Sequence, residues 1–212
     1  MTLAIVRHGQ STFNLQNRFT GDIDVPLTLL GKYEAFLAGK QLRETGVTFQ
    51  DAFSSRLLRS IQSLKAILEV VDPKKKVNTY QVKALNERSY GKLQGFSKTE
   101  SEEIYTKEKV NEWRRDFNSR PPGGETLAET YQRVVAFYRM TVEPLLLANH
   151  NVLIVAHGNS LRALIKYIEL ISDEDISKTE IATGTPILYD IQEGSNHCLC
   201  YQRRQSRHLQ QR

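Results

Sequence analysis

Two short apolar runs, one near each end of the chain, dominate its hydrophobic pattern. They cover residues Leu3–Val6 and Val152–Ala156, and no polar residue interrupts either run. Continuous apolar runs of this length are typical of strands that are buried on both faces of a parallel sheet. The pattern therefore predicts two central strands, formed by segments that lie far apart in the sequence.

Between the two runs, apolar residues recur at the spacing of α-helices. One set shares a single helix face: Leu57, Ile61, Leu64 and Leu68. Pro73 predicts that this helix ends at Asp72, because proline cannot continue the hydrogen-bond pattern. A second helix is predicted after Thr126 and Glu129, which have the spacing of a capping box. Its apolar positions are Val134, Phe137 and Tyr138.

A third helix is predicted to begin at Ser160, and its apolar residues lie on one side: Leu161, Leu164, Ile165 and Ile168. Strands that alternate with helices indicate a layered α/β fold. The sequence contains no internal repeat and no convincing linker. We therefore expect one domain over residues 1–212, with a basic tail at about residues 192–212.

The bulk composition is that of an ordinary globular protein, with 40% hydrophobic and 25% charged residues among 212. No apolar run is long enough to cross a bilayer, and no signal peptide precedes the first strand, so we expect no membrane association. Cys198 and Cys200 cannot build a disulfide framework, and their spacing differs from that of zinc sites. These features favour a cytoplasmic protein.

The net charge of +5 depends on the end of the chain. Residues 201–212 hold four arginines and no acidic residue, so the remainder of the chain carries only +1. A nearly neutral body argues against a nucleic-acid-binding domain. We interpret the arginines as part of a solvated end of the chain.

Side chains that could take part in catalysis follow both predicted strands. The first strand runs into Arg7-His8-Gly9, and the second into His157-Gly158-Asn159. Ligands of α/β proteins bind beyond the carboxyl ends of the strands. Each tripeptide alone is a weak signal, since a lone histidine is more often structural than catalytic. Two such histidines at the ends of two buried strands favour a shared site.

This combination suits phosphoryl transfer through a histidine. A neutral imidazole at His8 can present one nitrogen to phosphorus while a backbone carbonyl holds the other, and His157 can donate to phosphoryl oxygens. The guanidinium groups of Arg7 and Arg59 can bind phosphate in a bidentate manner. Glu87 is the best candidate for the acid that protonates the departing oxygen. The sequence has no phosphate-binding loop of the Gly-x-x-x-x-Gly-Lys type and no metal motif, so we expect no metal.

The chain closely resembles the 2,3-bisphosphoglycerate-dependent phosphoglycerate mutases of the histidine phosphatase superfamily. The likeness extends from about Leu3 to Asp190. The segments that carry it are Val6–Asn14, Asn17–Gly21, Ser55–Arg59, Leu85–Gly95, Trp113–Arg115 and Ala156–Arg162. Longer members of the family carry an insertion where this chain has only Asp116–Arg120 before Pro121.

The resemblance implies a three-layer αβα sandwich with a mostly parallel central sheet. It implies that His8 is phosphorylated and that Glu87 is the proton donor. It also implies that the enzyme interconverts 3-phosphoglycerate and 2-phosphoglycerate in glycolysis and gluconeogenesis. The implied intermediate is 2,3-bisphosphoglycerate, which also primes the enzyme. It further implies these substrate-binding residues: Asn14, Thr20, Gly21, Tyr90, Lys98, Arg114, Arg115, Gly158 and Asn159. The partners implied are small phosphorylated glycerates. The resemblance leaves the oligomeric state open, and a homo-oligomer is one of the alternatives.

Two other hypotheses compete with the mutase. The same architecture serves a bisphosphoglycerate phosphatase or a broad-specificity histidine phosphatase if water reaches the phosphohistidine. A catalytically inactive protein that binds phosphorylated ligands is the third hypothesis. The intact set of His8, His157, Arg7, Arg59 and Glu87 argues against inactivity.

Overall fold

The computed structural model describes residues 1–194 and 198–204. In it, the two apolar runs form strands β1 (Thr2–Arg7) and β4 (Val152–Ala156), and every residue of β4 is buried. The two strands pair in parallel, with Leu3 opposite Val152. The prediction of two neighbouring central strands is therefore confirmed, and their carboxyl ends lie at the same edge of the sheet.

The central sheet of the described residues contains six strands in the order β3-β2-β4-β1-β5-β6. The four further strands are β2 (Asp51–Ser54), β3 (Asn78–Gln81), β5 (Pro186–Glu193) and β6 (Leu199–Arg203). Strands β3, β2, β4 and β1 are parallel, whereas β5 and β6 are antiparallel to their neighbours. The sheet is thus mostly parallel, as predicted.

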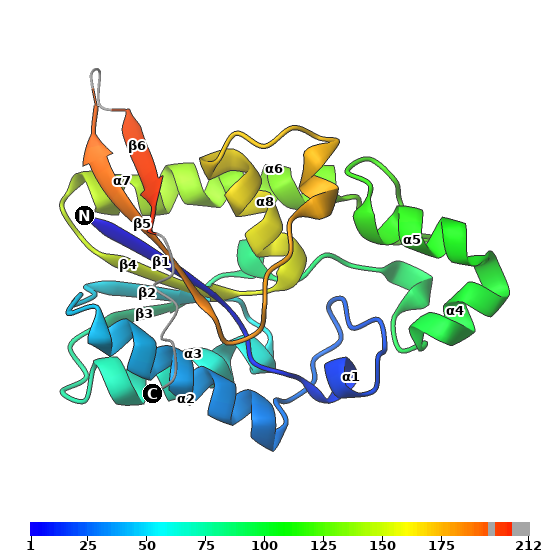
Figure 1. The fold of residues 1–212 in the computed structure, drawn as a ribbon, viewed down its shortest axis with the longest axis horizontal. Coiled ribbons are helices and arrows are strands. Elements are labelled where there is room, and N and C mark those ends of the chain that lie inside the picture. The colour runs from blue at the N-terminus through cyan, green and yellow to red at the C-terminus, as the bar shows by residue number, and fades with distance from the viewer. Residues whose placement is uncertain (195–197, 205–212) are drawn as a thin grey trace, which may run out of the picture.

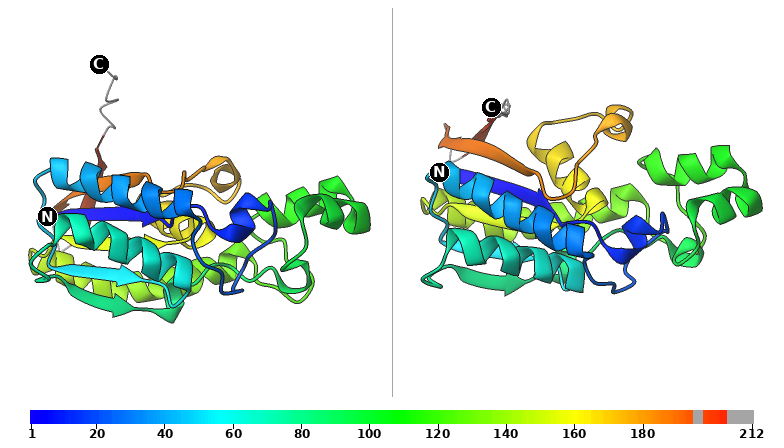
Figure 2. Two further views of the ribbon diagram at one scale, coloured as in Figure 1. Left: turned by 90° about the horizontal axis from the view of Figure 1, so that it is seen from below. Right: turned by 60° about the horizontal axis from the view of Figure 1, so that its bottom comes forward.

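Helices cover both faces of this sheet (Figures 1 and 2). Alternate residues of β1 point to opposite faces, as the pleat of a strand requires: Ala4 packs in one apolar core and Ile5 in the other. The first core lies against α2 (Leu29–Glu44) and α3 (Leu58–Val71). The second core lies against α6 (Leu127–Phe137), the π-helical turn η3 (Tyr138–Val142), α7 (Glu143–Leu147) and α8 (Gly158–Ile168). The three-layer αβα sandwich is confirmed.

The predicted helix ends agree with the structure except at α8. Helix α3 ends at Val71, with Asp72 as its cap, and the capping box in front of α6 forms as predicted. Helix α8 instead begins at Gly158, two residues before the predicted start. The hydroxyl of Ser160 accepts a hydrogen bond from the backbone N–H of His157, so Ser160 is the third residue of the helix rather than its cap.

A lobe of two helices extends beyond the carboxyl ends of β1 and β4 (Figure 1, and Figure 2, right). It consists of α4 (Lys98–Tyr105) and α5 (Lys107–Arg115). Trp113 of α5 is only 5% exposed and packs in a small apolar cluster with Phe19 and Leu93. Shorter elements connect this region to the sheet: α1 (Thr12–Leu15), η1 (Lys83–Leu85), η2 (Gly91–Leu93) and η4 (Asp175–Lys178).

Part of the predicted basic tail is a strand, so the structure differs from the prediction there. Residues Leu199–Arg203 form β6, which pairs antiparallel with β5, and Leu199 and Tyr201 of this strand are half-buried. Arg203 lies 3.2 Å from Glu169, and Arg204 lies 2.5 Å from Asp190, so two tail arginines are paired with acidic residues of the body. The remaining tail residues, 205–212, lie outside the described part of the chain.

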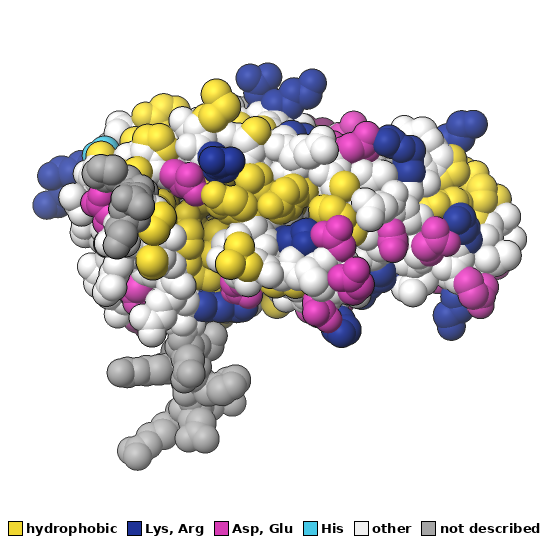
Figure 3. Space-filling model, turned by 90° about the horizontal axis from the view of Figure 1, so that it is seen from above, with side chains coloured by type: hydrophobic (Ala, Val, Ile, Leu, Met, Phe, Trp, Pro, Cys, Tyr) yellow, Lys and Arg dark blue, Asp and Glu magenta, His cyan; other side chains and the backbone are white. Residues whose placement is uncertain are grey.

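Surface charge is mixed on the face seen in Figure 3, where Lys and Arg side chains are interspersed with Asp and Glu. This face shows no single-sign surface of the kind that binds nucleic acid. Among the described residues, no helix combines the length and the apolar character needed to cross a membrane.

Candidate active site

The two histidines that follow β1 and β4 lie side by side. The ring centroids of His8 and His157 are 4.9 Å apart, and the ring planes are inclined by 62°. Both side chains are buried, with 3% and 0% exposure. The parallel pairing of β1 with β4 brings them together, since Arg7 and Ala156, the residues before them, are direct partners in the sheet.

The surroundings of His8 favour a neutral ring with one free lone pair. Its Nδ1 lies 2.7 Å from the carbonyl oxygen of Gly9, so the proton is expected on Nδ1. Its Nε2 then carries the lone pair and accepts a hydrogen bond of 3.3 Å from Nε of Arg59. Burial and the nearby charges of Arg59 and Arg7 hold the pKa of His8 well below its ordinary value of 6.5.

His157 is poised to donate a hydrogen bond. Its Nε2 lies 2.7 Å from Oγ of Ser55, whereas its Nδ1 is buried and has no hydrogen-bond partner among the described residues. Burial, followed by the charge of Arg59, lowers the pKa of His157 well below 6.5. Because buried polar atoms are almost always hydrogen-bonded, the orphaned Nδ1 indicates a place for a ligand atom.

Two arginines flank the histidine pair. Arg59 is 1% exposed and donates to the backbone carbonyls of Gly21, at 2.7 Å, and Ile23, at 2.9 Å. Burial lowers the pKa of Arg59 to about 10, which leaves it charged at neutral pH. Arg7 donates from Nη1 to the carbonyl of Ile181 at 2.8 Å, while its buried Nε has no partner among the described residues. The Nε–H group of Arg7 is therefore a donor that has no partner among the described residues.

Glu87 lies in a loop, as predicted, and its carboxylate meets the start of α8. Its Oε1 accepts hydrogen bonds from the backbone N–H groups of Arg88, at 2.9 Å, and Asn159, at 3.1 Å. A β-carbon built on Gly158 would lie 3.6 Å from Cζ of Arg7 and 3.7 Å from Oε2 of Glu87. The acid candidate, Arg7 and the amino end of α8 thus surround one point.

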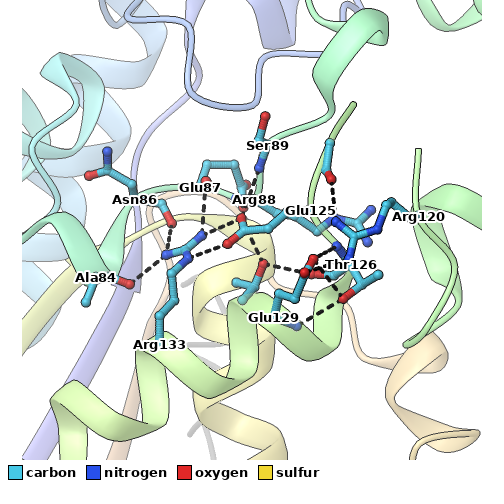
Figure 4. A network of polar contacts seen from close by, with 12 residues as sticks. Ala84, Asn86, Glu87, Arg88, Ser89, Arg120, Glu125, Thr126, Glu129 and Arg133 are labelled. Atoms are coloured by element: carbon cyan, nitrogen blue, oxygen red, sulfur yellow. Dashed lines mark hydrogen bonds and ion pairs between the residues drawn. The ribbon is translucent and has the colours of Figure 1, made fainter. Parts of the chain in front are cut away.

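An ion-pair network holds the loop that carries Glu87 (Figure 4). Arg133 of α6 donates to the backbone carbonyls of Ala84, Asn86 and Glu87 at 2.7 to 3.3 Å. The same guanidinium group is paired with Glu125 at 2.7 Å. Because Arg133 contacts the backbone rather than the Glu87 carboxylate, it fixes the loop and leaves the acid available.

The predicted site residues line a single pocket of about 290 Å³, with the exception of His157, which lies behind His8. The volume is close to the lower limit of typical small-ligand pockets. The predicted residues that line it are Arg7, His8, Asn14, Thr20, Gly21, Arg59, Glu87, Tyr90, Lys98, Arg114, Arg115, Gly158 and Asn159. The structure therefore brings together the predicted site residues of all six segments that resemble the family, together with Lys98.

Basic residues dominate the lining, with seven basic and two acidic side chains. Lys98, Arg114 and Arg115 come from the α4–α5 lobe. Burial, then the charge of Arg114, lowers the pKa of Lys98. Burial acts to raise the pKa of Tyr90, but the charge of Arg88 and the hydrogen bonds from Asn159 and Arg88 together lower it overall. These shifts reflect a strongly positive pocket.

Sequence reasoning missed several residues of the pocket. Arg18 and Arg162 also line it and belong to two segments that resemble the family, so the signal was available. Ser55, which holds His157, is the first residue of a third such segment. Glu180 also lines the pocket, and no motif or spacing marks it. Arg88, fully buried with two unpaired nitrogens among the described residues, donates to the backbone carbonyl of Trp113.

Gly9 lies where the loop after β1 packs against α2. A β-carbon at Gly9 would lie 2.0 Å from the carbonyl oxygen of Gly31 in α2, far inside van der Waals contact. Gly9 is therefore required for the close packing of the loop after β1 against α2.

Comparisons with known proteins identify the family of this chain. The family model described as histidine phosphatase superfamily (branch 1) matches residues 3–203. The chain is 49% identical to the 2,3-bisphosphoglycerate-dependent phosphoglycerate mutase of Cytophaga hutchinsonii, over 89% of this chain and 86% of that protein. It is 43% identical to the enzyme of the same description from Bartonella henselae, over 92% and 94% of the two chains.

Solved structures share the fold. A mycobacterial hydrolase superposes with a TM-score of 0.82 at 20% identity and covers 96% of both chains, a likeness that concerns the fold alone. The family model and the two sequence relatives each cover most of the chain. The chain therefore belongs to the histidine phosphatase superfamily and, within it, to the 2,3-bisphosphoglycerate-dependent phosphoglycerate mutases.

Proposed function

We propose that this chain interconverts 3-phosphoglycerate and 2-phosphoglycerate by way of a phosphoryl group carried on His8, with 2,3-bisphosphoglycerate as intermediate and primer. The observation that carries the proposal is a neutral His8 that lines one basic pocket and lies 4.9 Å, between ring centroids, from His157. The names of the sequence relatives support the substrate and the primer. The activity belongs to glycolysis and gluconeogenesis, and we infer a cytoplasmic location from it.

The residues present fit a primer with two phosphoryl groups. The buried Nε of Arg7 and Nδ1 of His157 lack partners among the described residues, and both lie beside His8. Lys98, Arg114 and Arg115 supply a second group of positive charges in the same pocket. Bound 2,3-bisphosphoglycerate supplies the phosphoryl group for His8. We infer that Arg7, Arg59 and His157 hold that phosphoryl group and that the lobe holds the glycerate end.

The chain's own residues account for the transfer. Nε2 of His8 forms a bond to phosphorus as the bond between phosphorus and the substrate oxygen breaks. Donors fixed before the reaction, on Arg7, Arg59 and His157, stabilise the charge on the equatorial oxygens. Glu87 delivers a proton to the departing oxygen and recovers one from the hydroxyl that accepts the phosphoryl group in the reverse step.

A coupled assay tests the proposal directly. Conversion of 3-phosphoglycerate to 2-phosphoglycerate is measured with and without added 2,3-bisphosphoglycerate while free phosphate is monitored. The mutase is expected to isomerise the substrate in a manner stimulated by the primer, with little phosphate released. Release of phosphate without isomerisation would assign the chain to the phosphatases instead.

The depressed pKa of His8 predicts a broad pH profile. Because the pKa lies well below 6.5, His8 stays neutral as the pH falls from about 7.5 to 6, so formation of the phosphoenzyme should not decline from its protonation in that range. The decline should begin only near the lowered pKa. The measurement is the single-turnover rate of phosphoenzyme formation against pH. An acid limb centred at or above 6.5 would contradict the assigned state of His8.

Chelation is expected to leave the rate unchanged. The described residues contain no group of three or more His, Cys, Asp or Glu side chains that could hold a metal ion, and arginines take the role that a cation would have. The measurement is the rate of isomerisation after dialysis against EDTA, compared with dialysis against buffer alone. A marked loss that added divalent metal restores would contradict a metal-independent mechanism.

A further inference from the structure

Glu180 is an acidic residue in a pocket lined mostly by basic side chains. Glu87 and Glu180 are the two acidic side chains among those that line it, and Glu87 has a role in proton transfer. Glu180 makes a different contact, since its Oε1 lies 2.5 Å from Nη1 of Arg115. The carboxylate of Glu180 therefore binds Arg115, one of the arginines inferred to bind the glycerate end of the substrate.

The contact is partly open to solvent. The side chain of Glu180 is 67% exposed and that of Arg115 is 31% exposed. Nη1 of Arg115 also donates to the backbone carbonyl of Ser177 at 3.3 Å, which holds the guanidinium group in place without the carboxylate. Ion pairs this exposed contribute little net stability, so Glu180 can be displaced at small cost.

Other charges keep Glu180 ionised and close to the pocket. Burial acts to raise its pKa, but the hydrogen bond and the charge of Arg115, with smaller contributions from Arg162 and Arg7, lower it overall. Glu180 also precedes Ile181, whose carbonyl accepts the hydrogen bond from Arg7. The backbone at Glu180 is thus anchored beside the phosphoryl end, while its side chain reaches the lobe.

We propose that Glu180 is an internal competitor of the substrate: its carboxylate occupies the place on Arg115 that the carboxylate of a phosphoglycerate takes, and it leaves when the ligand binds. This inference rests on the proposed function. Two like charges cannot share one guanidinium face without repulsion, so Glu180 weakens binding of any ligand with an anionic group at that end. The residue therefore sets the affinity for phosphoglycerates and favours release of the product.

A structural role would have the opposite consequence. If the contact mainly tied α5 to the segment after η4, its loss would loosen the lobe and weaken binding. The competitor predicts tighter binding when the charge is removed. The sign of the change in affinity therefore distinguishes the two roles.

The test compares the wild-type chain with Glu180→Gln by isothermal titration calorimetry, with no bisphosphoglycerate added. Two ligands are used: 3-phosphoglycerate and glycerol 3-phosphate, which lacks the carboxylate. Glu180→Gln is expected to lower the dissociation constant of 3-phosphoglycerate roughly three- to fivefold, as expected for loss of an exposed ion pair. The dissociation constant of glycerol 3-phosphate should change less than twofold, since that ligand offers no carboxylate to compete.

Glu174→Gln is the matched control. Glu174 is an exposed residue of the same segment that does not line the pocket, so its loss removes one negative charge without touching Arg115. An equal gain in affinity in this control, or an equal gain in affinity for both ligands, would mean that the effect comes from the change in net charge alone. Either result would overturn the inference. An unchanged or raised dissociation constant for 3-phosphoglycerate in Glu180→Gln would also overturn it.

The proposed function can fail separately. A wild-type chain that binds 3-phosphoglycerate and isomerises it, with no gain in Glu180→Gln, would overturn only the role of Glu180. A wild-type chain that binds no 3-phosphoglycerate would overturn the proposed function and this inference together.

Discussion

Replacing His8 with alanine is expected to lower the isomerisation rate by about 10⁴-fold or more, the scale of loss when a nucleophile is removed. In the proposed mechanism, Nε2 of His8 receives the phosphoryl group, and the neighbouring ring is not expected to substitute for it. Nε2 of His157 lies 2.7 Å from Oγ of Ser55, and its buried Nδ1, which has no partner among the described residues, is proposed to donate to the phosphoryl group. Without His8, transfer has no covalent intermediate.

The measurement is incorporation of acid-labile phosphate from labelled 2,3-bisphosphoglycerate, followed by location of the label in the sequence. His150→Ala is a suitable control, because His150 precedes β4, at the end of the strand opposite to His157, and contacts Asp51 at 2.6 Å. The His8→Ala chain should stay folded, since its ring makes few hydrogen bonds, each of which contributes about 1 kcal/mol. Retained labelling or turnover in a folded His8→Ala chain would assign the nucleophile elsewhere.

The centre of the sheet could be predicted from sequence because burial on both faces leaves a clear signal. Residues Val152–Ala156 are uniformly apolar and all are buried. Strand β3 (Asn78–Gln81) carries no such signal, because all four of its residues are exposed at the edge of the sheet. Strand β6 pairs only with β5, and its polar residues read as part of a tail.

The start of α8 shows how a correct local signal can be misread. Serine is common both as a helix cap and within the first turn, where its hydroxyl can bond to the cap. In this chain Ser160 accepts a hydrogen bond from the N–H of His157, so His157 itself is the cap. The sequence alone could not tell these two positions apart, since the serine hydroxyl accepts a hydrogen bond from a backbone N–H in either of them.

The site was predictable where residues directly follow apolar strands or lie in motifs that resemble the family, and unpredictable where they arrive by tertiary contact. His8 and His157 each follow an apolar strand, so their meeting follows from strand pairing. Glu180 enters the pocket only because the segment after η4 packs beside Arg7 and Arg115. Nothing near Glu180 in the sequence encodes that contact.

Replacing Glu87 with glutamine is expected to slow isomerisation by roughly 10²–10⁴-fold, the usual contribution of a positioned acid or base. In the wild-type chain, Oε1 of Glu87 accepts hydrogen bonds from the N–H groups of Arg88, at 2.9 Å, and Asn159, at 3.1 Å. The amide of the variant keeps an oxygen that can accept both. Arg133 contacts the backbone of the loop, so it should hold the loop in the variant as well. The change therefore removes the proton and leaves the shape of the site intact.

The leaving group makes this prediction specific to proton transfer. The departing oxygen of a phosphoglycerate needs a proton, whereas nitrophenolate leaves without one. The rate of His8 phosphorylation by p-nitrophenyl phosphate should therefore be far less sensitive to Glu87→Gln than the rate of isomerisation is. The control is Glu44→Gln, at an exposed position of α2, which should change neither rate. Equal losses with both substrates would mean that Glu87 orients the phosphoryl group or the loop rather than supplying the proton, and the acid would have to be sought among the other groups that line the pocket.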